Sequence, residues 1–403
     1  MLHIILILKK FLVLDIAIVR ANRAQNAQFM KNLIQTDETF YESIIRKGYS
    51  RRDFLKFATY MAAFMGLEHT MVGQLVETME TKKRLPVIWE HFQECTGCTE
   101  SFIKSDHPLV ADVILDTISL DYTDTLMAAA GHQAEEAKRE SMKENYGKYI
   151  LVVEGAIPTK DGGVYCTIAG RTAVDIIKES AAGAAAIITF GSCSSWGGVQ
   201  AASPNPTGAV PVDAIIKDKP IVKVPGCPPI AEVMTGTVLY YAMFGALPEL
   251  DSQGRPKQFY GKRVHDSCYR RPYFDAGLFA ESFDSEEAKK GYCLYKLGCR
   301  GPVTYNACGT TGWNNGLSFP VKSGYPCIGC SEANFWDNGP FYERLENIPG
   351  MGIETTADKI GKIIIGAAAA GAAVHAVATN IFKKDELKEA KEEGEINEQN
   401  LIE

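Results

Sequence analysis

The sequence predicts an α/β protein in which a flavodoxin-like, doubly wound parallel sheet is followed by an irregular cysteine-rich domain and an apolar C-terminal helix. Three observations predict this class. From Leu85 onward, short apolar runs alternate with helix-like segments; beyond residue 250, periodicity fades and cysteines crowd together; and Ile363 to Phe382 contains no acidic residue, lysine or arginine.

The sheet domain is expected over residues 85–250. Apolar runs that end in Gly, Pro or polar residues are typical of parallel strands buried on both faces. Helix-like segments lie between or after them, for example Thr172 to Ala182 and Ile230 to Phe244. The predicted strands are Pro86–Trp89, Tyr149–Val153, Ala186–Phe190 and Pro220–Val224.

Composition excludes some functions. The chain has 403 residues, 46% of them hydrophobic, which is enough for a sizeable core and two folded domains. The formal net charge is -7 and there is no long basic run, so no nucleic-acid partner is expected. Eleven cysteines need an explanation, and an odd number in a chain that can build a core argues against a disulfide framework.

Four cysteines follow predicted strands, where ligands of doubly wound sheets bind. Glycines precede or separate them and leave room for a bulky group close to the backbone. Four converging thiolates suit a 4Fe-4S cluster or a structural zinc ion, and one close pair with two isolated cysteines favours the cluster. These ligands are Cys95, Cys98, Cys193 and Cys227. Cys166 lies away from the strand ends and is expected to be a small buried apolar residue.

The polar stretch Glu249 to Gly261 marks the start of an iron-sulfur domain over 251–350. One group in this domain combines one imidazole with three thiols, and the neutral imidazole leaves a less negative site. It consists of His265, Cys268, Cys293 and Cys299. A second group has three thiols, which suits a 3Fe-4S cluster, and Pro320 stands among them without a coordinating atom. This group is Cys308, Cys327 and Cys330.

The first 84 residues are predicted to be an export leader. Ser50-Arg51-Arg52-Asp53-Phe54-Leu55-Lys56 precedes an apolar stretch too short to span a bilayer of roughly 30 Å. This pattern is typical of a twin-arginine signal, read by the twin-arginine export machinery, which carries folded proteins. The alternative is a chance Arg-Arg pair on a solvated surface. The cut is expected between Glu68 and Arg84, and Met30 is an alternative start.

Residues 359–382 are predicted to form a transmembrane anchor helix, followed by a charged cytoplasmic tail over 383–403. The many Ala and Gly residues make the segment weakly hydrophobic, so a buried soluble helix is the alternative. His375 lies in the middle of the segment. It is a candidate haem ligand for a membrane cytochrome, with a histidine hydrogen-bonded to a neighbouring helix as the competing interpretation.

On these motifs, residues 85–350 resemble the small subunit of a membrane-bound, periplasmic nickel-iron uptake hydrogenase. The resemblance implies a heterodimer with a large subunit that holds the nickel-iron centre, so this chain itself carries no catalytic residue. It also implies electron transfer to a membrane cytochrome b, with haem b, and to quinone, and it places the chain on the periplasmic face of the membrane. Two 4Fe-4S clusters and one 3Fe-4S cluster are implied. By this resemblance the proximal 4Fe-4S cluster would be bound by Cys95, Cys98, Cys193 and Cys227, and the distal 4Fe-4S cluster by His265, Cys268, Cys293 and Cys299. The medial 3Fe-4S cluster would be bound by Cys308, Cys327 and Cys330.

Some relatives carry a fourth cysteine at the place of Pro320. Oxygen-tolerant members resemble this chain but carry extra cysteines at the places of Gly97 and Gly198, so glycine at both implies an ordinary cubane and an oxygen-sensitive enzyme.

Three other functions compete with this interpretation. A hydrogen-sensing regulator is similar but cytoplasmic, which the leader speaks against. A respiratory-complex subunit related to the first domain typically has adjacent cysteines and lacks the second domain. A plain cluster-carrying electron shuttle would have no catalytic partner, and copurification would separate it from a hydrogenase subunit.

Overall fold

The computed structural model describes residues 39–46, 48–64, 69–81, 83–106, 108–343 and 357–399. The alternative start at Met30, residues 344–350 of the expected second domain and the last residues of the tail lie outside this part of the chain. Two compact units are present. The first holds the described residues up to Cys268 together with Cys299–Glu343, and the second holds Tyr269–Gly298 and the C-terminal segment.

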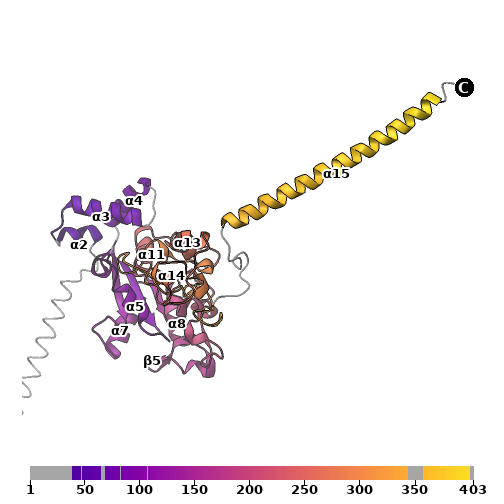
Figure 1. Cartoon of the computed structure of the whole chain (residues 1–403). Coiled ribbons are helices and arrows are strands. Elements are labelled where there is room, and N and C mark those ends of the chain that lie inside the picture. Colours follow the sequence, from indigo (N-terminus) through magenta and orange to yellow (C-terminus); the bar gives the residue numbers. More distant parts are fainter. Residues whose placement is uncertain are drawn as a thin grey trace, which may run out of the picture. The chain divides into compact units, whose positions relative to one another are not determined.

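A five-stranded parallel sheet forms the centre of the first unit (Figure 1). Its strand order is β2-β1-β3-β7-β9. Strand β2 lies on one side of β1 and all later strands lie on the other side, so the strand order reverses at β1. The strands are β1 Leu85–His91, β2 Ile118–Thr123, β3 Ile150–Glu154, β7 Ala186–Phe190 and β9 Ile221–Val224. The parallel sheet was predicted, and four of its strands match the expected apolar runs within a few residues.

Both faces of the sheet are buried, which is why its strands have nearly continuous apolar sequences. Along β1, Val87 and Trp89 join one hydrophobic cluster, whereas Ile88 points into the cluster on the other face. Helix α11, Ala231–Phe244, contributes to the first cluster and α8, Ala173–Ala182, to the second. Thr172 caps α8 by accepting a hydrogen bond from the backbone N–H of Asp175.

Helices and short strands connect or flank the main strands of this unit. They are α5 Gly97–Phe102, α6 Val110–Asp112, η2 Val113–Thr117, α7 His132–Glu144, β4 Ile157–Pro158, η3 Lys160–Gly163, β5 Thr167–Ile168, β6 Arg171–Thr172, α9 Gly191–Trp196, η4 Val199–Ala201, β8 Ala209–Val210 and α10 Val212–Ile215.

The predicted leader contains folded helices. They are α2 Phe40–Arg46, α3 Arg51–Phe64, η1 His69–Met71 and α4 Val72–Thr81. Phe54, Leu75 and Met79 are almost fully buried and belong to the same hydrophobic cluster as α11. Arg51 and Arg52 remain exposed at the start of α3.

The cysteine-rich part has little regular structure, as the sequence predicts. In the first unit it contains α12 Lys257–Tyr260, η5 Val264–Ser267, η7 Gly301–Val303 and η8 Ala307–Gly309. In the second unit it contains α13 Arg271–Asp275, α14 Glu286–Lys289 and η6 Tyr295–Leu297, where Phe274, Phe279 and Tyr295 pack edge to face or tilted around Cys293.

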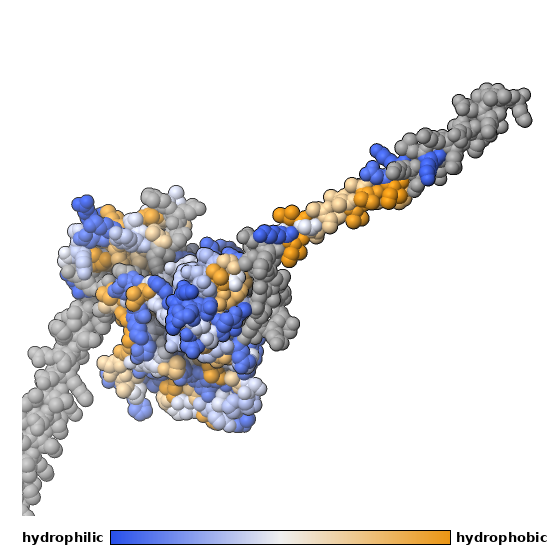
Figure 2. All heavy atoms as spheres, viewed as in Figure 1, coloured by the Kyte–Doolittle hydropathy of each residue, from blue (hydrophilic) through white to orange (hydrophobic). Residues whose placement is uncertain are grey.

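Helix α15 runs from Ala357 to Gln399. Its stretch Gly361–Lys383 is 23 residues long, has a mean hydropathy of 1.6 and is long and apolar enough to cross a bilayer. Figure 2 shows this stretch as an apolar belt along the helix, with hydrophilic residues near both of its ends. None of this stretch is buried inside the structure.

Candidate functional site

The first thiol group forms at the carboxyl edge of the sheet. Cys95 and Cys98 follow β1, with Cys98 inside α5; Cys193 lies in α9 directly after β7; and Cys227 lies in the loop after β9. Neighbouring parallel strands end at the same edge, so these three connections meet there. Cys98 is buried, whereas Cys95 and Cys227 are exposed.

Electrostatics show that the four thiols lie together. Burial raises the pKa of the Cys98 thiol well above its usual range, and the negative charges of Glu154, Cys193, Cys227 and Cys95 raise it further. Burial raises the pKa of Cys193 to about 12, with additional repulsion from Cys227 and Cys95. Thiols whose ionisation is opposed in this way would be stabilised as thiolates by a cation or a cationic cluster.

Two glycines keep side chains out of this group. Gly191 has φ +91°, and a Cβ added to it would lie 2.5 Å from the Cys98 Sγ. Gly198 has φ +67°, and its added Cβ would lie 2.6 Å from the Cys193 Sγ. A larger residue at either position would have a strained backbone, and the neighbouring thiol would have to move to make room for it.

A zinc ion would need the four sulfurs close together. Tetrahedral zinc with Zn–S bonds of about 2.3 Å needs sulfurs about 3.8 Å apart. Among the described residues, the group of three or more potential ligands with all ligand atoms within 4.8 Å of one another is His91, Glu94 and Glu154, and it contains no thiol. The four thiols of the first group do not form such a tight group in this structure.

Sequence reasoning missed Glu154, which ends β3 beside the first thiol group. Its carboxylate is almost fully buried and accepts hydrogen bonds from the backbone N–H groups of Cys98 (3.0 Å) and Thr99 (3.1 Å) and from the Thr99 hydroxyl (2.7 Å). Burial raises its pKa, against the opposing effects of the Thr99 hydrogen bond and the charge of His91. The signal was present in the sequence, because Glu154 is a charge that directly follows the apolar run Ile150–Val153.

His91 and Glu94 complete a polar cluster with Glu154. His91 Nδ1 lies 3.6 Å from a Glu154 carboxylate oxygen and 3.8 Å from one of Glu94. The buried His91 ring stacks on Trp89, with ring centroids 5.5 Å apart, and its Nε2 lies 3.2 Å from the Thr123 hydroxyl. These residues position Glu154, which in turn fixes the backbone of the Cys98 segment.

The second thiol group is assembled by the predicted residues Cys308, Cys327 and Cys330. Burial raises the pKa of Cys308 well above its usual range, and the charges of Cys330 and Cys327 add to the effect. Burial, followed by repulsion from Cys330, raises the pKa of Cys327 to about 12. The three thiols therefore share one buried environment. Pro320 is exposed, between the buried Phe319 and Val321.

Part of the third predicted group also lies in the first unit. Burial raises the pKa of Cys299 to about 12, and the charges of Cys327 and Cys268 contribute. His265 is buried in η5, three residues before Cys268. Cys293 belongs to the second unit and is buried there. Of the other predicted residues, Cys166 is partly buried against the second hydrophobic cluster and His375 is exposed on α15.

Hydrogen bonds connect the second group to each of the other two groups. The backbone N–H of Cys227, in the first group, donates to the sulfur of Cys330 in the second. The backbone N–H of Cys327, in the second group, donates to the sulfur of Cys299 in the third. Ser192 adds a second link, because its hydroxyl donates to the Cys330 carbonyl. The second group is therefore directly connected to both of the others.

Two family models match the chain. Residues 260–342 match the C-terminal part of NiFe/NiFeSe hydrogenase small subunits, and residues 95–241 match the 20 kDa subunit of NADH ubiquinone oxidoreductase. The first match covers the cysteine-rich part that a respiratory-complex subunit is expected to lack. It therefore favours a hydrogenase subunit over that competing interpretation.

Known proteins that are similar to this chain over most of its length are also hydrogenase subunits. An uptake hydrogenase small subunit of Azotobacter vinelandii is 58% identical, over 85% of this chain and 96% of that one. An uptake hydrogenase small subunit of Rhizobium leguminosarum is also 58% identical, over 86% of this chain and 96% of that one. A solved Ni-Fe-Se hydrogenase structure from Desulfomicrobium baculatum is 37% identical with a TM-score of 0.61, covering 65% of this chain and 100% of that one.

Proposed function

The chain belongs to the family of nickel-iron hydrogenase small subunits, and from that membership we propose that it is the electron-transfer subunit of an H2-oxidising respiratory enzyme. The observation that carries the proposal is the hydrogen-bonded series of three ligand groups, in which Cys227 contacts Cys330 and Cys327 contacts Cys299. A series of this kind suits electron movement between one redox partner and another.

The ligand groups support a specific assignment. The first group would hold a proximal 4Fe-4S cluster, Cys308, Cys327 and Cys330 a medial 3Fe-4S cluster, and the third group a distal 4Fe-4S cluster. When bound, these clusters supply one-electron redox chemistry. The chain's own residues space the clusters, exclude water from them and tune their potentials. The strand order, 2-1-3-4-5 when the five strands are counted along the chain, supports a flavodoxin-like first domain.

A large subunit with the nickel-iron centre is the proposed partner. Both Cys-x-x-Cys pairs of this chain, Cys95/Cys98 and Cys327/Cys330, belong to the groups described above. No such pair is left to bind a nickel-iron centre. The exposed Cys95 and Cys227 mark the face of the first unit that we expect the large subunit to cover.

We propose that the enzyme acts at the periplasmic face of the membrane. Arg51 and Arg52 are exposed at the start of α3, where Ser50 accepts a hydrogen bond from the Asp53 backbone N–H, so the export machinery can reach the arginines. The apolar belt of α15 would anchor the chain, and His375 within it would ligate haem b of a membrane cytochrome that passes electrons to quinone.

The enzyme is proposed to be oxygen-sensitive, because Gly97 and Gly198 leave the proximal site with four thiols. A Cβ at Gly97 would lie 3.1 Å from the Cys95 Sγ, so a cysteine there would add a sulfur beside the cluster. H2 oxidation by the purified enzyme should therefore stop in air. Sustained turnover in air would contradict this part of the proposal.

Copurification tests the proposed function. An affinity tag on the C-terminal tail should recover a second, larger chain that contains nickel, and the complex should reduce a dye with H2. A stable single chain with iron and no nickel would identify an electron shuttle instead. Cytoplasmic localisation with no dye reduction would favour a regulator.

A further inference from the structure

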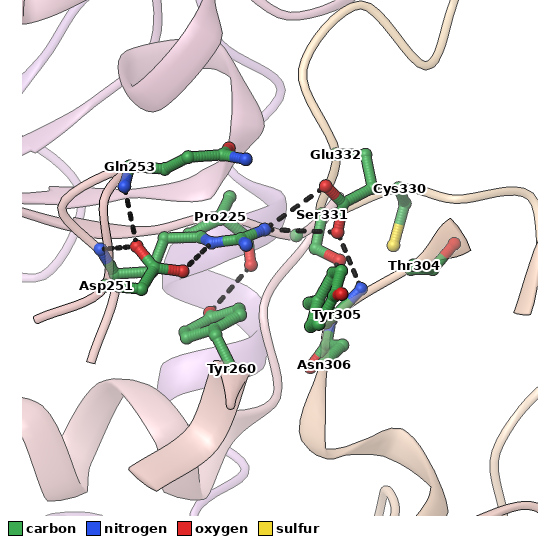
Figure 3. A network of polar contacts seen from close by, with 12 residues as sticks. Pro225, Asp251, Gln253, Tyr260, Thr304, Tyr305, Asn306, Cys330, Ser331 and Glu332 are labelled. Carbon is green, nitrogen blue, oxygen red and sulfur yellow. Dashed lines mark hydrogen bonds and ion pairs between the residues drawn. The ribbon is translucent and has the colours of Figure 1, made fainter. Parts of the chain in front are cut away.

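Arg255 is a buried cation with two carboxylate partners. Its side chain is 3% exposed; Nε donates to Asp251 Oδ2 at 2.8 Å, and one terminal nitrogen donates to both Glu332 oxygens at 3.1 and 3.2 Å. Figure 3 shows Asp251 and Glu332 on opposite sides of this network. Arg255 thus connects the segment before the cysteine-rich part with the segment directly after Cys330.

The network also holds the backbone at two ligand groups. The Arg255 guanidinium lies over the rings of Tyr260 (5.6 Å) and Tyr305 (5.4 Å). Tyr260 donates from its hydroxyl to the Pro225 carbonyl at 2.8 Å, two residues before Cys227. Glu332 accepts a hydrogen bond from the Tyr305 backbone N–H at 2.6 Å, and Figure 3 shows both bonds.

The second thiol group lies within electrostatic reach of this network. Burial raises the pKa of Tyr260 well above its usual range, and the charges of Cys308 and Cys330 add to the effect. Glu332 lies two residues after Cys330, and the intervening Ser331 donates from its hydroxyl to the Tyr305 carbonyl at 2.9 Å. Burial raises the pKa of Glu332, whereas the hydrogen bond from the Tyr305 N–H and the facing Arg255 guanidinium favour its charged form.

We propose that Arg255 and Glu332 form a charge pair that positions the medial ligand loops and sets the reduction potential of the medial cluster. This inference rests on the proposed function, because it assumes that Cys308, Cys327 and Cys330 hold a cluster. Arg255 is a positioning residue: it fixes the carboxylate in one place beside the thiols and cancels most of its field. Arginine suits this task because its planar fork donates to two carboxylates at once.

The charges of Glu332 and Arg255 have opposite effects on the reduction potential of the cluster, because reduction adds a negative charge to it. Removing the Glu332 charge should favour the reduced cluster and raise its potential. Removing the Arg255 charge leaves two carboxylates without their cation and should lower the potential. Removing both should restore a value near that of the wild type. A residue with a purely structural role would not produce opposite shifts that cancel.

The experiment is a redox titration of the assembled complex, followed by the electron paramagnetic resonance signal of the oxidised 3Fe-4S cluster. The variants are Glu332→Gln, Arg255→Gln and the double variant. Glu332→Gln should increase the ratio of reduced to oxidised cluster at a fixed potential by about tenfold, or about 59 mV for one electron. Arg255→Gln should shift the ratio in the opposite direction. Lys257→Gln, which removes a cation from an exposed ion pair in the same segment, should change nothing.

The outcomes separate the inference from its premise. A wild-type complex without the 3Fe-4S signal would refute the medial assignment itself. A normal wild-type signal with equal potentials in Glu332→Gln and wild type, or with shifts of the same sign in both single variants, would overturn the role of the charge pair alone. If Arg255→Gln does not assemble, Arg255→Lys keeps the charge and should retain the wild-type potential, while Glu332→Gln still has to shift upward.

Discussion

The backbone N–H of Cys227 donates a hydrogen bond to the sulfur of Cys330, so a ligand of the first thiol group touches a ligand of the second. Ser192 stabilises this contact. Its hydroxyl donates to the Cys330 carbonyl and accepts from the Gly226 backbone N–H at 3.0 Å, and its own N–H donates to the Gly226 carbonyl at 2.8 Å. One buried serine thus fixes both loops of the contact.

Ser192→Ala should weaken the contact and slow electron transfer from the proximal to the medial cluster. The substitution leaves the part-buried Cys330 carbonyl and the buried Gly226 N–H without this partner, which costs about 1–3 kcal/mol of folding free energy. Freeze-quench paramagnetic resonance after mixing with H2 should show slower loss of the oxidised 3Fe-4S signal. Ser282→Ala, which removes an exposed hydrogen bond to Asp284, is the matched control. Unchanged medial reduction in Ser192→Ala would show that the contact does not limit transfer.

Thiol substitutions should separate ligands from ordinary cysteines. Cys193→Ala removes one of four thiols from the first group, so the complex should lose one cluster's share of its iron and should not pass electrons from H2 to a dye. Cys166→Ala should keep its iron, because Cys166 packs partly buried against apolar residues. Iron analysis of the purified complexes checks both. Equal iron losses in the two variants would contradict the assignment.

The sequence predicts where the first thiol group lies, and the reason is geometric. Cys95, Cys193 and Cys227 each follow an apolar run, and the carboxyl ends of parallel strands necessarily share an edge. Strand β2 was missed because its sequence, Ile118–Thr123, alternates polar and apolar residues at the edge of the sheet, unlike the continuous apolar runs of the central strands. A strand at the edge of the sheet therefore lacks the continuous apolar run by which a buried strand is recognised.

Long-range partners could not be predicted from one sequence. Arg255 and Glu332 are 77 positions apart, and no pattern in the sequence around either residue predicts that the two form a buried ion pair. The packing of Phe54 and Leu75 into the core of the sheet domain was missed for a related reason, since a leader-like pattern around Arg51 and Arg52 gave no indication that these helices would have buried faces. Only tertiary packing supplies this information.

Pro320→Cys should add a fourth thiol to the medial site. With four thiolate ligands the 3Fe-4S cluster should convert toward 4Fe-4S, and the added negative charge should lower its reduction potential. The paramagnetic signal of the oxidised 3Fe-4S cluster should then decrease. Pro320 is exposed between the buried residues Phe319 and Val321, so the substitution removes no buried side chain. An unchanged signal would count against the placement of Pro320 beside the cluster.

His375→Leu should separate the membrane step from the earlier steps. His375 is exposed on α15 within the apolar belt, so leucine keeps the helix and its hydrophobicity while it removes the imidazole. Membranes with this variant should still reduce a soluble dye with H2, because the thiol groups are untouched, but H2-dependent quinone reduction should fall at least tenfold and haem b should be lost. Thr379→Val, one turn further along the helix, removes a hydroxyl that bonds only to the His375 backbone carbonyl among the described contacts, and it should leave both activities unchanged. Quinone reduction at the wild-type rate in His375→Leu would show that another residue ligates the haem and that His375 serves helix packing.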